Sequence, residues 1–220
     1  MSVPTAAYRP PPDEGLAVVY ADDWLLVLDK PAGLLSVPGR GADKADCLVA
    51  RAQREFADSL IVHRLDMETS GLIVLARGEE MHRRLSRQFR EREVAKRYVA
   101  VAAGQLVADE GSIDLPLITD WPNRPRQKVD HDIGKPSLTH YRVLSRDADT
   151  TRVELEPVTG RSHQLRVHLL SLGHPLLGDR LYAPQAIAEA VPRLLLHAWL
   201  LAFTHPQTGI TLNFERTAEF

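Results

Sequence analysis

The sequence contains a single cysteine and no long hydrophobic run, and these two absences exclude whole classes of protein. Because a disulfide needs two thiols, Cys47 alone excludes the intrachain disulfide framework of small secreted domains. No apolar stretch approaches the ~20 residues that a membrane-spanning helix needs. The N-terminal segment also lacks the basic start and apolar core of a signal peptide. We therefore expect a cytoplasmic protein with no membrane partner.

The motifs that hold nucleotides and metals are missing as well. There is no glycine-rich phosphate loop ending in Gly-Lys and no Gly-x-Gly-x-x-Gly fingerprint. No His-Glu-x-x-His motif or pair of cysteines indicates zinc. His163 and His168 are five residues apart, which is a poor spacing for two ligands on one helix face. We therefore expect no cofactor and no metal.

The chain does have enough apolar residues for one substantial core. Of its 220 residues, 44% are hydrophobic and 25% are charged, as in ordinary soluble globular proteins. The formal net charge of −2 does not indicate a nucleic-acid binder, but binding depends on local charge. Each basic group of the chain is either a solvated face or an RNA contact, and the sequence leaves both open. The groups are residues 77–97, with eight Arg or Lys and four Glu, then Arg124, Arg126 and Lys128, and then Arg161 and Arg166.

Short apolar runs between turn residues predict more strands than helices. Residues 1–15 are proline-rich and are expected to form a flexible arm, followed by a single domain over 16–220. Because strands and helices do not alternate regularly, we expect an α+β protein with a large mixed or antiparallel β-sheet flanked by helices. The expected strands are 16–20, 24–30, 72–76, 96–104, 140–144, 151–158, 193–203 and 210–214, and the expected helices are 47–56, 79–93 and 162–173.

The clearest helix, over 79–93, has two different faces. Apolar residues recur at i, i+4 and i+8 and form a stripe for the core, whereas arginines follow a similar period on another face. Those arginines either pair with Glu91 and Glu93 in solvent or contact the backbone of RNA. The apolar stripe is Met81, Leu85 and Phe89, and the basic face is Arg83, Arg87 and Arg90.

The helix expected over 162–173 has signals at both of its ends. Ser162 can cap the first turn, and Gly173 can end the last one. Its leucines are spaced to face the core, and they are Leu165, Leu169 and Leu172.

The stretch IVHRLDMETSGLIVLAR, residues 61–77, places Asp66 among short apolar runs and directly before the arginine-rich helix. One interpretation is an Asp that hydrogen-bonds its own turn, as many do. The other is a functional carboxylate, which a half-buried cleft keeps ionised only beside a cation. Arg64 and Arg161 are candidates for that cation, and spacing alone does not decide between the two interpretations.

Four segments carry a resemblance to a known family. HRLDMETSGLIVLA, at 63–76, resembles the signature of the RluA family of pseudouridine synthases. KRYVA at 96–100 resembles its Lys-x-Tyr motif, the segment 160–179 its arginine motif, and the segment 193–201 its C-terminal leucine motif. The four occur in the family's order, so the resemblance is specific and covers nearly the whole chain. It implies the pseudouridine synthase fold, and the short N-terminal segment leads us to expect no S4 domain.

The resemblance implies a reaction that needs no cofactor. A uridine inside RNA is detached from its ribose at N1, turned and rejoined through C5, so no electron or phosphate changes hands. Catalysis is assigned to Asp66, which either attacks C1′ or removes the C2′ proton, and both acts require an ionised carboxylate. The resemblance further implies that Arg161 pairs with Asp66, that Tyr98 stacks on the uracil and helps to move the C5 proton, and that Leu195 forms the other apolar wall.

The resemblance also implies two RNA partners, a hairpin loop of 23S rRNA and the anticodon loop of certain tRNAs, and we expect a monomer. A stacked base must be flipped out of the RNA, at roughly a few kcal/mol for unstacking. Arg64, beside Asp66, either fills the gap that the base leaves or forms a structural ion pair. The other residues that we assign to substrate binding are His63, Arg87, Arg90, Arg124, Arg126, Lys128 and His163.

Two other functions remain open from the sequence. A non-catalytic RNA-binding protein would explain the basic groups, but not the occurrence of Asp66, Tyr98 and Arg161 together. A glycoside hydrolase would need two carboxylates across a sugar, whereas the motifs assign only one. Release of tritium from C5-labelled uridine separates an isomerase from the first alternative, and a search for abasic sites in RNA separates it from the second.

Overall fold

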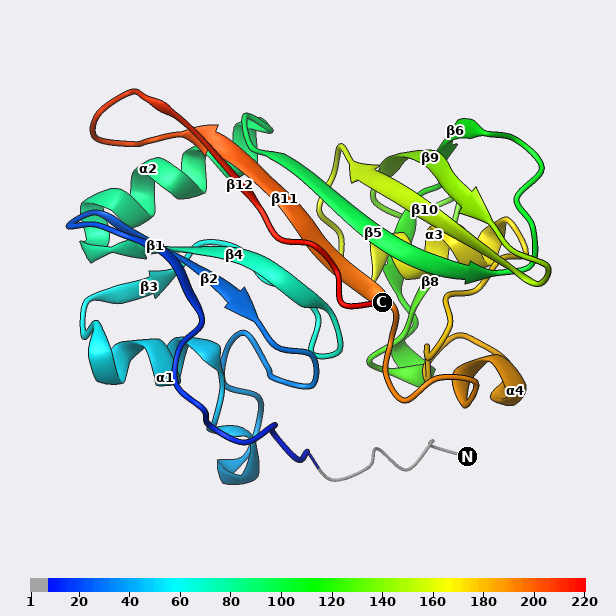
Figure 1. The fold of residues 1–220 in the computed structure, drawn as a ribbon, viewed down its shortest axis with the longest axis horizontal. Helices are drawn as coiled ribbons and strands as arrows, with labels where there is room; N and C mark the ends of the chain where they lie inside the picture. Colours follow the sequence, from blue (N-terminus) through cyan, green and yellow to red (C-terminus); the bar gives the residue numbers. More distant parts are fainter. Residues whose placement is uncertain (1–7) are drawn as a thin grey trace. The chain divides into compact units, whose positions relative to one another are not determined.

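The computed structural model describes residues 8–220, which form two compact units (Figure 1). We call residues 8–96 and 197–219 the terminal unit, and residues 97–196 with Phe220 the central unit. Within the described residues the chain passes from one unit to the other after Lys96 and after Leu196, and its last residue, Phe220, returns to the central unit. Within the described residues, no helix is long and apolar enough to cross a membrane.

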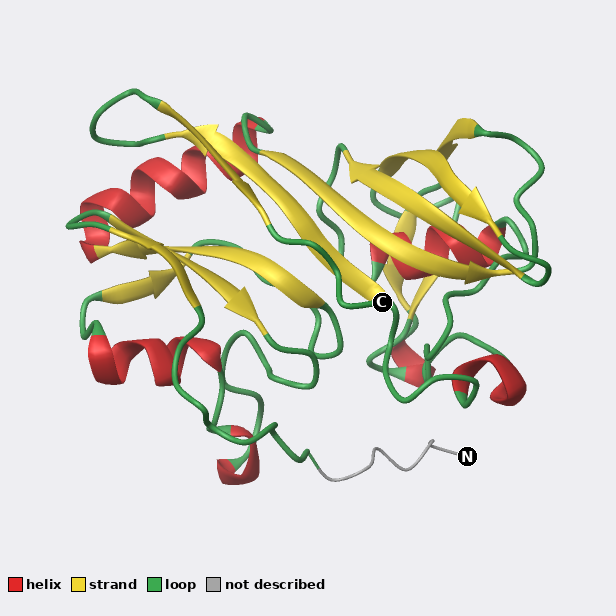
Figure 2. Cartoon of the chain, in the orientation of Figure 1, coloured by secondary structure: helices red, strands yellow, loops and turns green. Residues whose placement is uncertain are grey.

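The terminal unit is built on a mixed β-sheet with helices beside it (Figure 2). Its elements are β1 (Val18–Ala21), β2 (Leu25–Lys30), the 3-10 helix η1 (Ala42–Lys44), α1 (Leu48–Glu55), β3 (Ser59–Ile61), β4 (Ser70–Arg77), α2 (Gly78–Glu91), β11 (Leu196–Thr204) and β12 (Thr211–Glu215). β4 pairs antiparallel with β2 and β3, and parallel with β11. β1 extends this sheet from β2, and β12 extends it from β11, both in antiparallel pairing.

The core of the terminal unit lies between β4, its neighbouring strands and α2. Leu25 and Val27 of β2 pair with Ala76 and Val74 of β4, and all four side chains are buried in one cluster. Helix α2 packs on β4 with its apolar stripe, as its period predicts. The helix expected over 79–93 is confirmed at Gly78–Glu91, with Met81 and Leu85 buried, Phe89 packed against the core, and Arg83, Arg87 and Arg90 exposed.

Gly71 allows β4 and β11 to pair directly after the loop that carries Asp66. Its φ is +110°, and a Cβ atom at this position would lie 2.3 Å from the carbonyl oxygen of Ala198. Any residue with a Cβ is strained at such a φ and would collide with β11. Only glycine therefore fits at this position.

The described part of the N-terminal segment is fixed to the terminal unit by hydrogen bonds. The Tyr8 hydroxyl donates to the carbonyl of Asp46 at 3.0 Å and accepts the N–H of Leu35 at 3.1 Å. The buried Arg51 of α1 donates to the carbonyl of Pro11 at 2.7 Å. These bonds connect the segment both to α1 and to the chain that follows β2.

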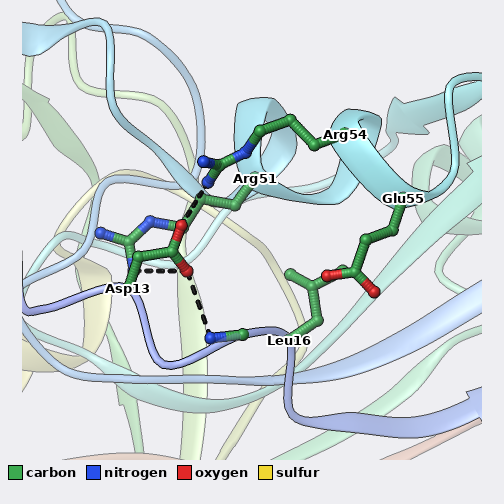
Figure 3. Close-up of a pocket in the computed structure, with 6 residues that line it drawn as sticks. Asp13, Leu16, Arg51, Arg54 and Glu55 are labelled. Carbon is green, nitrogen blue, oxygen red and sulfur yellow. Dashed lines mark hydrogen bonds and ion pairs between the residues drawn. The ribbon is translucent and has the colours of Figure 1, made fainter.

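Figure 3 shows a pocket between this segment and α1. Asp13 accepts a hydrogen bond from Arg54, and one of its oxygens lies 3.7 Å from Arg51. Arg51 also donates two hydrogen bonds to Asp46, at 2.7 and 2.9 Å, so the two guanidinium groups face two carboxylates and hold the chain segment against α1. Tyr8, Pro11 and Asp13 are thus bonded to the terminal unit, residues 1–7 lie outside the described residues, and the flexible arm over 1–15 stays a prediction.

The central unit is built on antiparallel strands. Its elements are β5 (Ala95–Ala103, whose first two residues belong to the terminal unit), β6 (Glu110–Asp114), β7 (Leu117–Thr119), the 3-10 helix η2 (Trp121–Asn123), β8 (Gln127–Val129), β9 (Leu138–Arg146), β10 (Thr150–Pro157), α3 (Gln164–Ser171) and α4 (Gln185–Ala188). β10 pairs with β5 and β9, β6 pairs with β9, and β7 and β8 form a separate hairpin. Together, the mixed and antiparallel sheets and their flanking helices confirm the predicted α+β class.

The start of α3 differs from its prediction. The cap position belongs to His163, in the left-handed conformation with φ of 54°, and Ser162 does not occupy it. No side chain caps this helix; the buried Gln164, its first residue, instead accepts the N–H of Arg161 at 3.0 Å and so holds the turn that precedes the helix. The prediction of Ser162 as the cap is therefore wrong.

The buried face of α3 agrees with its prediction at two of three leucines. Leu165 and Leu169 lie in the core cluster of the central unit, together with apolar residues of β5 and β10. Leu172 is 41% exposed because the helix ends one residue earlier, at Ser171. The expectation that Leu172 faces the core is wrong for that reason.

Arg166 of α3 forms a buried ion pair. Its guanidinium donates two hydrogen bonds to Asp179, at 2.6 and 2.8 Å, and lies 5.0 Å from the ring centroid of Tyr182. The side chains of Arg166 and Asp179 are only 4% and 1% exposed. Arg166 is therefore neither part of a solvated basic face nor accessible to RNA, the two possibilities that the sequence left open for it.

Candidate active site

Asp66 is half-buried in the loop between β3 and β4. Its main-chain carbonyl accepts the N–H of Thr69 at 3.1 Å, which closes the turn before β4. The residue before it, Leu65, is held by Ser36: the Ser36 hydroxyl donates to the Leu65 carbonyl at 2.8 Å and accepts the Leu65 N–H at 3.2 Å. Both residues are buried, so the backbone on this side of Asp66 is fixed.

The residue after Asp66 is held by Lys30, the last residue of β2. Lys30 is fully buried, and its ammonium donates to the carbonyl of Met67 at 3.0 Å and to two carbonyls of the turn that follows β2. The N–H of Gly33 also donates to the Met67 carbonyl, at 2.9 Å. Carbonyl oxygens thus replace the water that an ammonium loses on burial. The segment 30–36 therefore holds the Asp66 loop on both sides.

His63 and Arg64 lie at the start of the same loop in different surroundings. The Nε2 of His63 accepts the N–H of Val74 at 3.1 Å, and its ring stacks on Phe89 with 4.3 Å between centroids. Burial lowers the pKa of His63 to about 3, and the nearby charge of Lys96 adds to this effect. His63 is therefore neutral near pH 7 and connects the loop to β4 and α2, whereas Arg64 is exposed.

In the central unit, Arg161 lies in the turn between β10 and α3. Its side chain is exposed, and its Nε donates to the carbonyl of Pro136 at a long 3.4 Å. Gln164 holds the turn from within, because it bonds the Arg161 N–H, the hydroxyl of Thr159 at 2.7 Å and the hydroxyl of Thr139 at 2.9 Å. An exposed guanidinium is thus presented on a firmly held backbone.

His163, two residues further on, connects this turn to another part of the central unit. Its Nδ1 lies 2.6 Å from the hydroxyl of Tyr182, and the same hydroxyl accepts the N–H of Gln127 at 2.8 Å. Gln127 begins β8, directly after the segment that contains Arg124 and Arg126. His163 is therefore linked by a single tyrosine to that basic segment.

Tyr98 and Leu195 both lie close to the points where the chain passes between the units. Tyr98 in β5 pairs with Leu155 of β10, and its half-buried ring packs against the core of the central unit. Leu195 is also half-buried, and its carbonyl accepts the N–H of Val101 at 3.1 Å. Each side chain therefore has part of its apolar surface accessible.

The remaining predicted RNA contacts lie on two exposed surfaces, one in each unit. On α2, Arg87 and Arg90 approach Glu91 at 3.7 and 3.6 Å. In the central unit, Lys128 lies 3.4 Å from Asp130. Within residues 8–220, no group of three or more His, Cys, Asp or Glu residues is placed to hold a metal ion. The terminal unit thus contains His63, Arg64, Asp66, Arg87 and Arg90, and the central unit contains Tyr98, Arg124, Arg126, Lys128, Arg161, His163 and Leu195.

Sequence reasoning missed the side chains that fix the two loops, Lys30, Ser36 and Gln164. Lys30 had no usable signal, because in sequence it is a charged residue at the end of an apolar strand, and its burial is known only from the structure. Ser36 and Gln164 are ordinary polar residues in sequence, and their partners are known only from the structure.

Comparisons with known proteins agree on one family. The family model described as RNA pseudouridylate synthase matches residues 24–171. Over 214 residues, the chain is 53% identical to the dual-specificity RNA pseudouridine synthase RluA of Escherichia coli strain K12, covering 97% of this chain and 98% of that protein. The protein of the same name from Yersinia pestis is 55% identical over 207 residues, 93% of this chain and 100% of that one. The structure of human RNA pseudouridylate synthase domain containing 1 is similar with a TM-score of 0.80 and 30% identity, over 96% of this chain and 87% of that one.

Proposed function

We propose, because this chain belongs to the RNA pseudouridylate synthase family, that it modifies uridines in both ribosomal and transfer RNA. As a member of that family, the chain is an isomerase that converts uridine to pseudouridine. The observation that carries the finer proposal is the full-length match to relatives called dual-specificity enzymes. We infer the substrates to be a hairpin loop of 23S rRNA and the anticodon loop of certain tRNAs, whose unpaired bases and shape a small protein can read.

The reaction breaks the C1′–N1 bond of the uridine and forms a C1′–C5 bond. The proton on C5 leaves and N1 carries a proton in the product, so substrate and product contain the same atoms. We assign the first step to Asp66, which attacks C1′ or removes the C2′ proton. Either act needs a carboxylate held in a defined position. The hydrogen bonds of Ser36 and Lys30 to the residues on both sides of Asp66 supply that position.

The other assigned residues handle the base and its charge. We assign to Tyr98 stacking on the uracil and help in moving the C5 proton, and to Leu195 an apolar wall, since both side chains are only half-buried. Arg161 is assigned as the cation that pairs with Asp66. Arg64 is exposed, in agreement with entry into the gap that a flipped base leaves in the RNA.

Incubation with RNA that carries C5-tritiated uridine tests this function. We expect tritium release from both the 23S rRNA hairpin and the tRNA anticodon stem-loop, because C5 loses its proton in the isomerisation. The RNA should contain no abasic sites afterwards. Release from one of the two RNAs alone would contradict dual specificity, and abasic sites would indicate a glycosidase.

Replacing Arg161 with Met is expected to damage catalysis more than RNA binding. In the proposal Arg161 holds the carboxylate of Asp66 in place for the chemical step, so the single-turnover rate at saturating RNA should fall while the affinity for RNA changes little. The control is Arg180→Met, which removes another exposed arginine of the central unit. A loss of RNA affinity with an unchanged single-turnover rate would instead make Arg161 a phosphate contact.

Changing Arg87 and Arg90 together to Gln is expected to weaken the binding of all RNAs alike. Each lost phosphate contact should reduce the slope of log affinity against log salt by roughly 0.7–0.9. The control is Arg84→Gln on the same helix, because Arg84 already donates to Glu80 at 2.8 Å. If affinity and slope stay unchanged in the double variant, the two arginines only pair with Glu91, at under ~1 kcal/mol for each pair.

A further inference from the structure

Trp121, in the 3-10 helix η2, is left exposed at the surface of the central unit. It is 65% exposed, and it is the one aromatic residue among the large exposed hydrophobic side chains of residues 8–220. Aromatic side chains are normally buried in a core or an interface, because they remove much apolar area from water. An indole that folding leaves in water is available for a contact outside the chain.

The indole already carries a cation on one side. The guanidinium carbon of Arg124 lies 4.5 Å from its ring centroid, and both side chains are exposed. Together, a planar guanidinium and an indole in this arrangement present a surface on which a third flat group can stack.

The loop that presents this pair is closed by hydrogen bonds of its own. The N–H of Asp120 donates to the carbonyl of Arg126 at 2.9 Å, and the N–H of Arg126 donates to the carbonyl of Asn123 at 3.1 Å. The Asn123 side chain also donates to the Asp120 carboxylate at 2.9 Å. A flat ligand would therefore meet a preformed surface, with little ordering left to be done on binding.

The surroundings of the indole are basic and are attached to the turn of Arg161. Arg124, Arg126 and Lys128 follow within seven residues of Trp121. The next residue after Arg126, Gln127, is bonded to Tyr182, which in turn contacts His163. An RNA strand on this loop would thus lie on the same bonded framework as the turn before α3.

We propose that Trp121 and Arg124 form a stacking site for an unpaired base of the RNA substrate, with Arg126 and Lys128 on the adjoining phosphates. Single-stranded nucleic acid is bound by this combination of aromatic faces and positive charge. The inference rests on the proposed function in taking RNA as the ligand. It adds a site for a base other than the uridine that reacts. Through this site the protein would bind stem-loops with unpaired nucleotides more tightly than paired RNA.

Trp121→Leu and Trp121→Phe test the stacking site by RNA affinity, measured at several salt concentrations. With a stem-loop, Trp121→Leu should lower the affinity by roughly tenfold, and Trp121→Phe should keep most of it, because phenylalanine retains a stacking face. Neither should change the salt slope, since no charge is removed. With a fully paired duplex of the same length, Trp121→Leu should bind as the unchanged protein does. Val107→Ser, at a 97% exposed apolar residue of the same unit, is the matched control.

Three outcomes would overturn the proposal. Affinity of Trp121→Leu within twofold of the unchanged protein would make the indole a local cover for Arg124 or a contact for a protein partner. An equal loss with duplex and stem-loop would indicate a general electrostatic or folding effect, and an equal loss for Leu and Phe would exclude stacking. Failure of the proposed function is recognised separately: the unchanged protein would then release no tritium, even if its stem-loop binding depends on Trp121.

Discussion

Replacing Asp66 with Asn is expected to abolish pseudouridine formation while the fold stays intact. The rate should be at least ~10⁴-fold lower, as in other enzymes that lose a catalytic group. Asn has nearly the size of Asp, and the carbonyl of residue 66 can still accept the N–H of Thr69. An amide, however, is neither an anionic nucleophile nor a base for the C2′ proton. Tritium release under single-turnover conditions measures the chemical step directly.

The control for this variant is Glu68→Gln, two residues further along the same loop. Glu68 is a half-buried carboxylate, like Asp66, and has no assigned role. We expect it to keep its activity, and urea unfolding should give similar stabilities for both variants. Turnover of Asp66→Asn within tenfold of the unchanged protein would end the assignment of Asp66, and so would an equal loss of activity in Glu68→Gln.

The sequence predicted the elements whose patterns are long and regular. The helix at Gly78–Glu91 has a clear period of apolar residues, and the buried strand β4 is a continuous apolar run between turn residues. The three-residue strands β3, β7 and β8 were missed, because so short a segment carries no measurable period. The start of α3 was misplaced because His163 occupies the cap position in the left-handed conformation, with no side-chain hydrogen bond that a sequence pattern could reveal.

The division into two units was not predictable from composition. The chain leaves the terminal unit after Lys96, within β5, and returns after Leu196, at the start of β11. A domain boundary is usually recognised by a polar or proline-rich linker, and neither passage has one, because both fall within strands. Asp66, Tyr98 and Arg161 were assigned from the family motifs, whose order along the chain does not depend on which unit holds them.

The supporting residues of the site were not predictable, because their partners are far away in sequence. Lys30 donates to Met67, which is 37 residues further along the chain, and Ser36 is bonded to Leu65, which is 29 residues away. No local pattern shows that a lysine will be enclosed by carbonyl groups. The motif thus predicts Asp66 as the reactive group, whereas only the structure shows how its loop is held.

Replacing Asp179 with Asn is expected to destabilise the protein by about 3–5 kcal/mol, the usual effect of removing one partner from a buried ion pair. Arg166 is 4% exposed, so its guanidinium would be left in the interior without a compensating charge. The Asp179 carboxylate also accepts the N–H groups of Leu181 and Tyr182. The amide of the variant has a single acceptor oxygen, so it could keep only some of the hydrogen bonds that the carboxylate accepts. Urea unfolding monitored by circular dichroism measures the change in the free energy of unfolding.

A double variant distinguishes two effects: the loss of the ion pair itself, and the burial of one charge without its partner. Arg166→Met with Asp179→Asn should be less destabilised than the sum of the two single variants, because neither buried charge is then left alone. The matched control is Glu156→Gln, in a pair with Arg97 that is 3.1 Å long in the same unit but 48% and 40% exposed. Because solvent screens that pair, its loss should cost under ~1 kcal/mol. If Asp179→Asn costs no more than this control, burial does not determine the contribution of the Arg166–Asp179 pair, and its role is confined to positioning Tyr182 beneath the guanidinium.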